Sequence, residues 1–249
     1  MLPMINALTA LLNHWFAAPI VAVMTMLGIH PAHPTHPITN PITMQLVVMT
    51  LLVLFFLAAR LSLNVEKPNA IQQTAEFIHE FVSNQADQVI GHGYERFMPF
   101  VTTILLFVLI CNCFGLLPGF ETPTADPVAP LGIAILTFVY YNFHGMRVQG
   151  PVKYVKHFAG PIWWIAWLMF PIEIISHLAR IMSLTIRLFA NMLASDLITL
   201  VAFSLIPIVV PVLGLGLHFA VSLIQAYIFM LLAMIYLAMA VSHEEEASI

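Results

Sequence analysis

The sequence is poor in charged residues. Only 8% of its 249 residues are Asp, Glu, Lys or Arg, whereas 61% are hydrophobic and the mean hydropathy is +0.95. A soluble domain carries about 25% charged residues. The composition therefore excludes an ordinary water-soluble protein and predicts a chain whose solvent is the lipid bilayer.

Basic residues are scarce as well. Eight Lys or Arg against twelve Asp or Glu give a formal charge of −4, so the clustered basic surface of a nucleic-acid-binding protein is missing. We expect no nucleic acid among the partners. The first apolar stretch, residues 15–29, has no Lys or Arg before it, unlike a cleaved signal peptide. We expect this stretch to remain on the mature protein.

Cysteine is nearly absent. Cys111 and Cys113 lie in one apolar run and would point about 200° apart on a helix, so we expect neither a disulfide between them nor a thiolate metal site. The tract of residues 30–37, rich in His and Pro, has two interpretations: a metal site or an extended polyproline linker. The Pro spacing favours the linker. We expect no metal and no cofactor.

Long apolar runs make up most of the remaining chain. A helix needs about 20 apolar residues to cross the hydrocarbon layer. The runs predict about five crossings, near residues 44–62, 97–117, 131–149, 162–206 and 208–241. The last two exceed one span, so we expect a long tilted hairpin that bends near Pro171 and Pro211. The predicted fold class is an all-α, polytopic membrane protein, in which residues 97–241 form one helical domain.

The loop cations define the expected orientation, because cytoplasmic loops carry an excess of Lys and Arg. With the N-terminus outside and five crossings, all six loop cations fall on the inner side: Arg60, Lys67, Arg96, Arg147, Lys153 and Lys156. We therefore expect residues 1–43 to form an outer segment and residues 242–249 a cytoplasmic tail.

The cytoplasmic loop of residues 63–96 contains an amphipathic pattern. Apolar side chains fall on one face and polar side chains point away from it: Ala75, Ile78, Phe81 and Val82 against Glu76, Glu80 and Gln85. This pattern predicts a helix that lies along the membrane interface. Because its charges are acidic, we expect it to pack against protein rather than anionic lipid.

The ionisable residues within the apolar runs gather on one predicted helix. Residues spaced three, four or seven positions apart share one face of a helix. Such spacing joins the following side chains into a single polar stripe: Glu173, His177, Arg180, Ser183, Arg187 and Asn191. Ionisable groups in a bilayer are costly, and for this reason they mark functional sites. Asp196 lies about 13 Å beyond Arg187 along the helix, and Glu173 about 21 Å before it. Two acids therefore bracket one buried cation.

The next helix carries a second stripe, formed by His218, Ser222 and Gln225. In an antiparallel hairpin His218 lies near the depth of Asp196, and Gln225 near that of Arg187. We therefore predict an Asp196/His218 cluster towards the outer side and an Arg187/Gln225 pair at the midplane.

The Ser and Thr residues of both stripes fit ordinary hydrogen bonding between helices. Arg187 does not, because no carboxylate lies within one turn of it on its own helix. An unpaired guanidinium at mid-depth is very costly, so we expect its partner elsewhere. Arg180 has two interpretations: it pairs with Glu173, or it extends to the inner surface.

The run Ser183–Met192 resembles the signature S-L-x-x-R-L-F-x-N-M of the a-subunit family of F-type ATP synthases. Further matches, in the expected order from about residue 41 to 241, are Asn112–Pro118, Pro123–Asp126, Leu223–Phe229 and Tyr236–Leu237. The resemblance implies a proton-translocating stator subunit in a bacterial inner membrane, whose C-terminal hairpin faces a ring of c subunits.

The resemblance also implies roles for individual residues. It assigns Arg187, Gln225 and Asn191 to the face beside the c-ring, with Arg187 as the essential arginine. It assigns Asp196, His218, Asn112 and Asp126 to the half-channel open to the outside, and Glu173, His177 and Ser183 to the cytoplasmic half-channel. The outer acid is usually Glu in the family. Asp196 is one methylene shorter and would need His218 or a water molecule to close the gap.

The implied partners are the c-ring, the peripheral-stalk b subunits and the rest of the synthase. The sequence contains neither a His-Glu-x-x-His motif nor a Gly-rich phosphate loop, so we expect no catalytic site in this chain. The alternative is a self-contained secondary ion transporter or channel. That function would predict an internal inverted repeat, and no repeat of domain size is evident.

Overall fold

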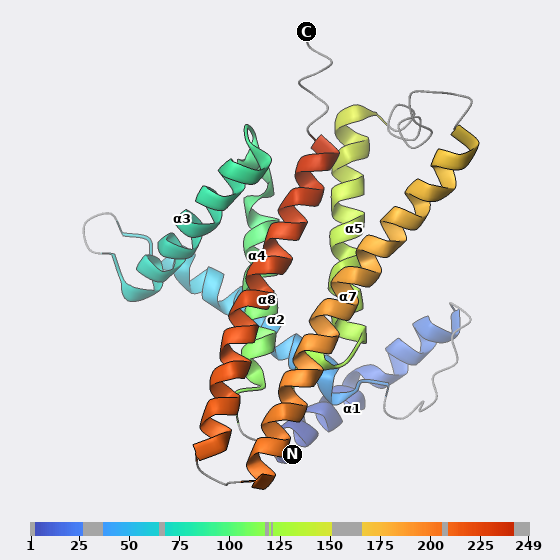
Figure 1. Ribbon diagram of the computed structural model, residues 1–249. Coiled ribbons are helices and arrows are strands. Elements are labelled where there is room, and N and C mark those ends of the chain that lie inside the picture. Colours follow the sequence, from blue (N-terminus) through green and yellow to red (C-terminus); the bar gives the residue numbers. More distant parts are fainter. Residues whose placement is uncertain are drawn as a thin grey trace.

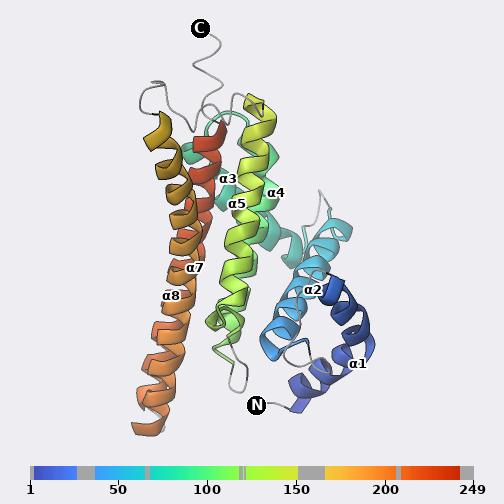
Figure 2. The same cartoon turned by 90° about the vertical axis from the view of Figure 1, so that its right-hand side faces the viewer.

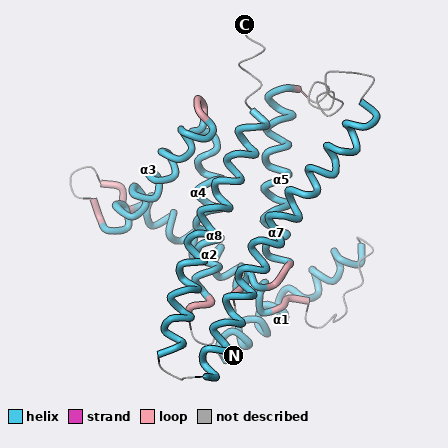
Figure 3. Tube along the Cα trace, viewed as in Figure 1, coloured by secondary structure: helices cyan, strands magenta, loops and turns pink. Residues whose placement is uncertain are grey.

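A computed structural model describes residues 3–26, 37–64, 68–117, 120, 122–150, 166–205 and 209–241. Within these ranges the chain forms helices and no strands (Figure 3), so the all-α prediction is confirmed. Most of the His and Pro tract, residues 30–36, and the tail of residues 242–249 lie outside the described residues. The same is true of Lys67, Lys153 and Lys156.

The long helices are α1 Pro3–Met26, α2 Asn40–Leu61, α3 Ala70–Ile90, α4 Met98–Phe114, α5 Val128–Gln149, α7 Ala166–Leu205 and α8 Val209–Val241. Two 3-10 helices, η1 Tyr94–Phe97 and η2 Pro123–Ala125, lie between them. By length and composition, six segments of the described chain are sufficient to cross a membrane: Leu8–Met26, Asn40–Leu61, Tyr94–Phe114, Val128–Val148, Trp167–Ala202 and Val212–Val241. The first, in α1, falls in the predicted outer segment.

Helix α1 lies obliquely beside α2, at the edge of the molecule (Figure 2). The Asn13 side chain holds the chain just before α2: its Nδ2 donates to the Ile38 carbonyl and its Oδ1 accepts from the Ile38 amide, both at 2.9 Å. Thr9 adds a hydrogen bond of 2.9 Å to Thr43. These polar contacts fasten α1 to the start of α2.

Helices α7 and α8 form the predicted long hairpin. They run antiparallel and span 40 and 33 residues, and α7 is inclined against the neighbouring α5 (Figure 1). At 1.5 Å per residue, α7 is about 60 Å long, roughly twice the thickness of the hydrocarbon layer. A helix of this length crosses a membrane only at a tilt or by projecting from it.

Helix α8 is the centre of the packed core, where it contacts α4, α5 and α7. Its buried side chains recur every three or four residues, as expected of one helix face: Ala226, Phe229, Met230, Ala233, Met234, Leu237 and Ala240. The alanines let the neighbouring helices approach closely, which is how helices associate in lipid.

Helix α3 slants across α4 and α8, in keeping with the predicted amphipathic helix (Figure 1). Val82 and Ala86 are fully buried, whereas Phe77 is 71% exposed. The expectation that Gln85 points away is wrong: its side-chain oxygen accepts a 3.0 Å hydrogen bond from the Tyr227 hydroxyl of α8. Gln85 lies one turn after Val82 and therefore shares its buried face.

Three segments meet at the C-terminal end of α4. Gly115 ends this helix, and the chain at Thr122 and the His218 ring of α8 both pack directly against it. A Cβ atom on Gly115 would collide with the Thr122 hydroxyl oxygen and would lie 2.8 Å from His218 Cε1. Only glycine allows this approach, because any other residue carries a Cβ.

We predict that Gly115→Ala destabilises this junction by about 1–3 kcal/mol, because an added methyl group in a filled core forces its neighbours apart. The measurement is the temperature at which the subunit unfolds in its purified complex. Gly132→Ala on α5 is the control, since its new Cβ meets nothing within 4 Å. An unchanged unfolding temperature for Gly115→Ala would contradict the packing described.

Candidate functional site

Part of the predicted polar stripe lies where α7 and α8 face each other. Arg187 and Asn191 of α7 and Gln225 of α8 line one cavity of about 310 Å³. Its other lining residues are apolar or small: Ala194, Ser195, Ile198, Leu217, Val221, Ile224 and Ile228. Three of the predicted site residues, Arg187, Asn191 and Gln225, therefore form the polar part of a cavity whose lining is otherwise mostly apolar.

Arg187 is half-buried near the middle of α7 and has little to neutralise it. Its one recorded hydrogen bond, of 3.4 Å, runs from Nη2 to the Ser183 hydroxyl one turn earlier. Among the described residues no carboxylate forms an ion pair with it. The guanidinium is thus available to an acid from outside the described part of this chain.

Gln225 is only 2% exposed, and its partner is not the one predicted. Its Oε1 accepts a 2.9 Å hydrogen bond from Asn191 Nδ2. Arg187 and Gln225 line the same cavity, as their predicted depths require, but the hydrogen bond of Gln225 is made with Asn191. Asn191 lies one turn after Arg187 on the same face of α7, and its side-chain amide donates the hydrogen bond to Gln225 Oε1.

A second group, which we call the Asp196 cluster, consists of Asp196, His218, Asn112, Thr122 and Thr124. Asp196 Oδ1 lies 3.3 Å from His218 Nδ1, as the antiparallel register predicts, and accepts a 2.9 Å hydrogen bond from Thr122. His218 Nε2 lies 3.0 Å from the Asn112 carbonyl oxygen. Thr124 donates to Asn112 Oδ1 at 2.6 Å. The predicted residues Asp196, His218 and Asn112 thus form one connected network.

Asp126 is not part of this network. Its Oδ1 accepts a 2.9 Å hydrogen bond from the Val128 amide at the start of α5. A carboxylate in this position satisfies one of the free amides of a helix N-terminus. The structure therefore gives Asp126 a capping contact and no recorded contact with Asp196.

A third group, the Glu173 cluster, lies near the other end of α7 and contains Glu173, His177 and Tyr141. His177 Nε2 lies 3.6 Å from Glu173 Oε1, and His177 Nδ1 lies 2.7 Å from the Tyr141 hydroxyl of α5. Arg180 forms no ion pair with Glu173 within the described chain, and its guanidinium carbon lies over the Tyr236 ring, 5.3 Å from the ring centroid. Ser183 bonds to Arg187 and not to the Glu173 cluster.

Sequence reasoning missed Thr122, Thr124 and Tyr141. Thr122, which caps the short 3-10 helix η2, is 3% exposed, Thr124 within that helix is 0% exposed, and Tyr141 is 3% exposed. Buried hydroxyls need hydrogen-bond partners. Thr124 lies in the matched run Pro123–Asp126, and this match is the signal in the sequence that could have identified it. The contact of Tyr141 depends on the register of α5 against α7, which nothing in the sequence fixes.

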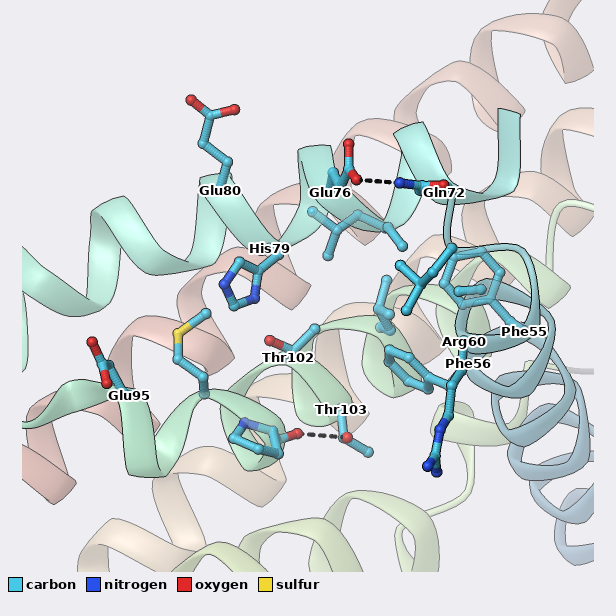
Figure 4. Close-up of a pocket in the computed structure, with 17 residues that line it drawn as sticks. Phe55, Phe56, Arg60, Gln72, Glu76, His79, Glu80, Glu95, Thr102 and Thr103 are labelled. Atoms are coloured by element: carbon cyan, nitrogen blue, oxygen red, sulfur yellow. Dashed lines mark hydrogen bonds between the residues drawn. The ribbon is translucent and has the colours of Figure 1, made fainter. Parts of the chain in front are cut away.

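Another cleft, with a volume of about 790 Å³, lies elsewhere, between α2, α3 and α4. Figure 4 shows His79 directed into it and Glu80 directed away. Its charged lining residues are Arg60, Glu76, Glu80 and Glu95. None of the predicted site residues lines this cleft, so it is distinct from the α7 and α8 site.

Comparison with known proteins identifies the family. The family model described as "ATP synthase A chain" matches residues 41–238. A protein named ATP synthase subunit a from Koribacter versatilis is 52% identical over 235 residues, covering 94% of this chain and 96% of that protein. One of the same name from Solibacter usitatus is 45% identical over 223 residues, covering 90% and 95%.

A third relative, also named ATP synthase subunit a, from Helicobacter pylori, is 42% identical over 206 residues, covering 82% of this chain and 91% of that protein. The matches span nearly the whole set of described helices. Together with the long apolar helices they identify a multi-pass membrane protein. The chain belongs to the ATP synthase A chain family.

Proposed function

We propose that this chain is the proton-translocating stator subunit of a bacterial F-type ATP synthase, in the inner membrane. Family membership and the names of its bacterial relatives support the proposal. The observation that carries it is Arg187, a permanently charged group on an apolar helix that has no ion-pair partner among the described residues. Such a cation needs an anion from another chain.

A ring of c subunits provides this anion in the proposed mechanism. A carboxylate that passes Arg187 loses its proton, because a nearby positive charge favours the ionised form. At about 4 Å and an effective dielectric constant near 20 the attraction is about 4 kcal/mol, enough to change the protonation state. When the ring turns the carboxylate away, it regains a proton.

The Asp196 and Glu173 clusters form the two half-channels of the proposal. Asp196 and Glu173 lie about 13 Å and 21 Å from Arg187 in opposite directions along α7. Arg187 repels protons between them, so a proton crosses the membrane only on the ring, and transport is coupled to rotation. Asp126 belongs to the outer mouth, and Ser183 and His177 belong to the inner route.

The proposed topology keeps the N-terminus outside. Residues 1–43 form the outer segment, 44–62 the first crossing, 63–96 the cytoplasmic loop with α3, and 242–249 the cytoplasmic tail. The partners are the c-ring, the peripheral-stalk b subunits and the nucleotide-binding part of the synthase. In this proposal ATP is made by those partners, and this chain has no catalytic centre.

Arg187→Ala is expected to abolish ATP-driven acidification of inverted membrane vesicles while the complex still assembles. Without the cation, ring carboxylates no longer lose their protons at the stator, and protons leak between the half-channels. Arg187→Lys is expected to fail as well, because a flexible ammonium does not replace the planar, always-charged guanidinium.

The matched control is Arg147→Ala, which removes an exposed arginine from the last turn of α5. It should leave acidification unchanged. Normal coupled pumping by the Arg187→Ala complex would refute the proposed function.

Asp196→Asn is expected to slow proton conduction by about tenfold or more, since an amide accepts a hydrogen bond but relays no proton. Conduction is measured in vesicles under an imposed potential, after removal of the nucleotide-binding part. The loss should be less complete than with Arg187→Ala. Asp87→Asn, an exposed change on α3, is the control. Wild-type rates would exclude Asp196 as a relay.

A further inference from the structure

The imidazole of His177 is enclosed by aromatic side chains of α5. His177 is 8% exposed, and the Tyr141 ring lies nearly parallel to its imidazole, with 6.0 Å between the centroids and 18° between the planes. Phe138 meets the same imidazole edge-on, at 5.7 Å between centroids. Phe138 and Tyr141 are three residues apart and therefore share one face of α5. This face holds the imidazole in place.

The Tyr141 hydroxyl adds a directional contact. Its oxygen lies 2.7 Å from His177 Nδ1, and Tyr141 is 3% exposed. Either atom can donate, depending on which ring nitrogen carries the proton, but both cases need a nitrogen at this position. If the ring turned over, Cδ2 would take the place of Nδ1 and the hydrogen bond would be lost. The hydroxyl therefore fixes which edge of the ring faces α5.

The other ring nitrogen lies near the acid of the same cluster. His177 Nε2 is 3.6 Å from Oε1 of Glu173, which lies one turn earlier on α7. The His177 side chain is 10% exposed and that of Glu173 is 36% exposed, so the carboxylate is the more accessible of the two. Along α7, His177 lies about 15 Å from Arg187, between Arg187 and Glu173.

We propose that Tyr141 is a positioning residue of the inner half-channel, which holds the His177 ring so that Nε2 stays available to Glu173. This inference rests on the proposed function, in which His177 and Glu173 belong to the inner route. The Nε2–H bond of a protonated His177 breaks, the bonding pair stays on the nitrogen, and the proton joins a Glu173 carboxylate oxygen. Without the Tyr141 hydrogen bond the ring can turn, and Nε2 no longer faces the acid.

The packing around Tyr141 allows its hydroxyl to be removed without its ring. The Tyr141 ring also contacts Phe138 at 5.5 Å and Tyr236 of α8 at 5.8 Å, both measured between centroids. Tyr141→Phe keeps these ring contacts. Tyr140→Phe is the matched control, because the Tyr140 ring stacks on Phe100 at 3.6 Å and its hydroxyl has no recorded hydrogen bond within the described chain.

Tyr141→Phe is expected to lower passive proton conduction about fivefold, the effect of losing one hydrogen bond between neutral groups. Conduction is measured in vesicles under an imposed potential, after removal of the nucleotide-binding part. Tyr140→Phe should conduct as the unchanged protein does. Wild-type conduction by an assembled Tyr141→Phe complex would overturn the proposal.

A double-mutant cycle separates positioning from a general loss of packing. A residue that acts through His177 has no effect once His177 is replaced. We therefore expect Tyr141→Phe to leave conduction unchanged in a His177→Gln complex, which by itself conducts less than the wild type. An equal fold-loss in both backgrounds would show that Tyr141 does not act through His177, and the positioning role would be rejected.

The ring orientation is testable without any change at Tyr141. In the assembled complex, with histidine labelled by ¹⁵N and tyrosine Cζ by ¹³C, we expect solid-state NMR to show a dipolar contact between a tyrosine Cζ and His177 Nδ1. The His177 signals are those lost in the His177→Gln complex. A contact of Cζ with Nε2 in place of Nδ1, or no contact at all, would contradict the proposed orientation.

These results are distinguishable from a failure of the proposed function. Wild-type conduction by Tyr141→Phe would reject the positioning role, while loss of pumping in Arg187→Ala would still support the stator function. Coupled pumping by Arg187→Ala would instead reject the function itself. The NMR contact depends on neither result, because it reports the geometry of His177 and Tyr141 alone.

Discussion

The site between α7 and α8 is centred on a single charge, Arg187, that no carboxylate of the described chain neutralises. Arg187 lies on a helix of 40 residues, with one weak hydrogen bond to Ser183 and no ion pair within the described chain. The free energy of holding such a group away from water is high. A protein tolerates it only where another molecule supplies the counter-charge, and the proposed function identifies that molecule as the c-ring.

The rest of the core holds this charge in place. Helix α8 packs against α4, α5 and α7 with one alanine-rich, buried face, and this fixes the height of Gln225 and His218 opposite α7. Asn191 and Gln225 complete the polar lining beside Arg187. At the end of α4, Gly115 admits Thr122 and His218 to the same point. Rigid packing therefore determines which polar atoms meet.

The polar groups outside the Arg187 cavity form separate networks. The Asp196 cluster joins α4, the chain at Thr122, α7 and α8, whereas the Glu173 cluster joins α5 and α7. Each network contains a carboxylate and a histidine, and histidine is the residue type whose unperturbed pKa lies near neutral pH. The proposed function, with its two offset half-channels, requires such a separation along α7.

The sequence by itself determined the helices, the hairpin and the stripe of Glu173, His177 and Arg187, because hydrophobic length and helical periodicity depend on local order alone. It also determined that Asp196 and His218 meet, since the few residues between the two long apolar runs limit the register of an antiparallel pair. Only the tertiary structure decided the contacts between helices distant in the chain. Tyr141 joins His177, Thr122 joins Asp196, Gln85 joins Tyr227, and Asn191 joins Gln225 beside Arg187. These contacts depend on side-chain shape and on the relative height of packed helices, which no local pattern encodes.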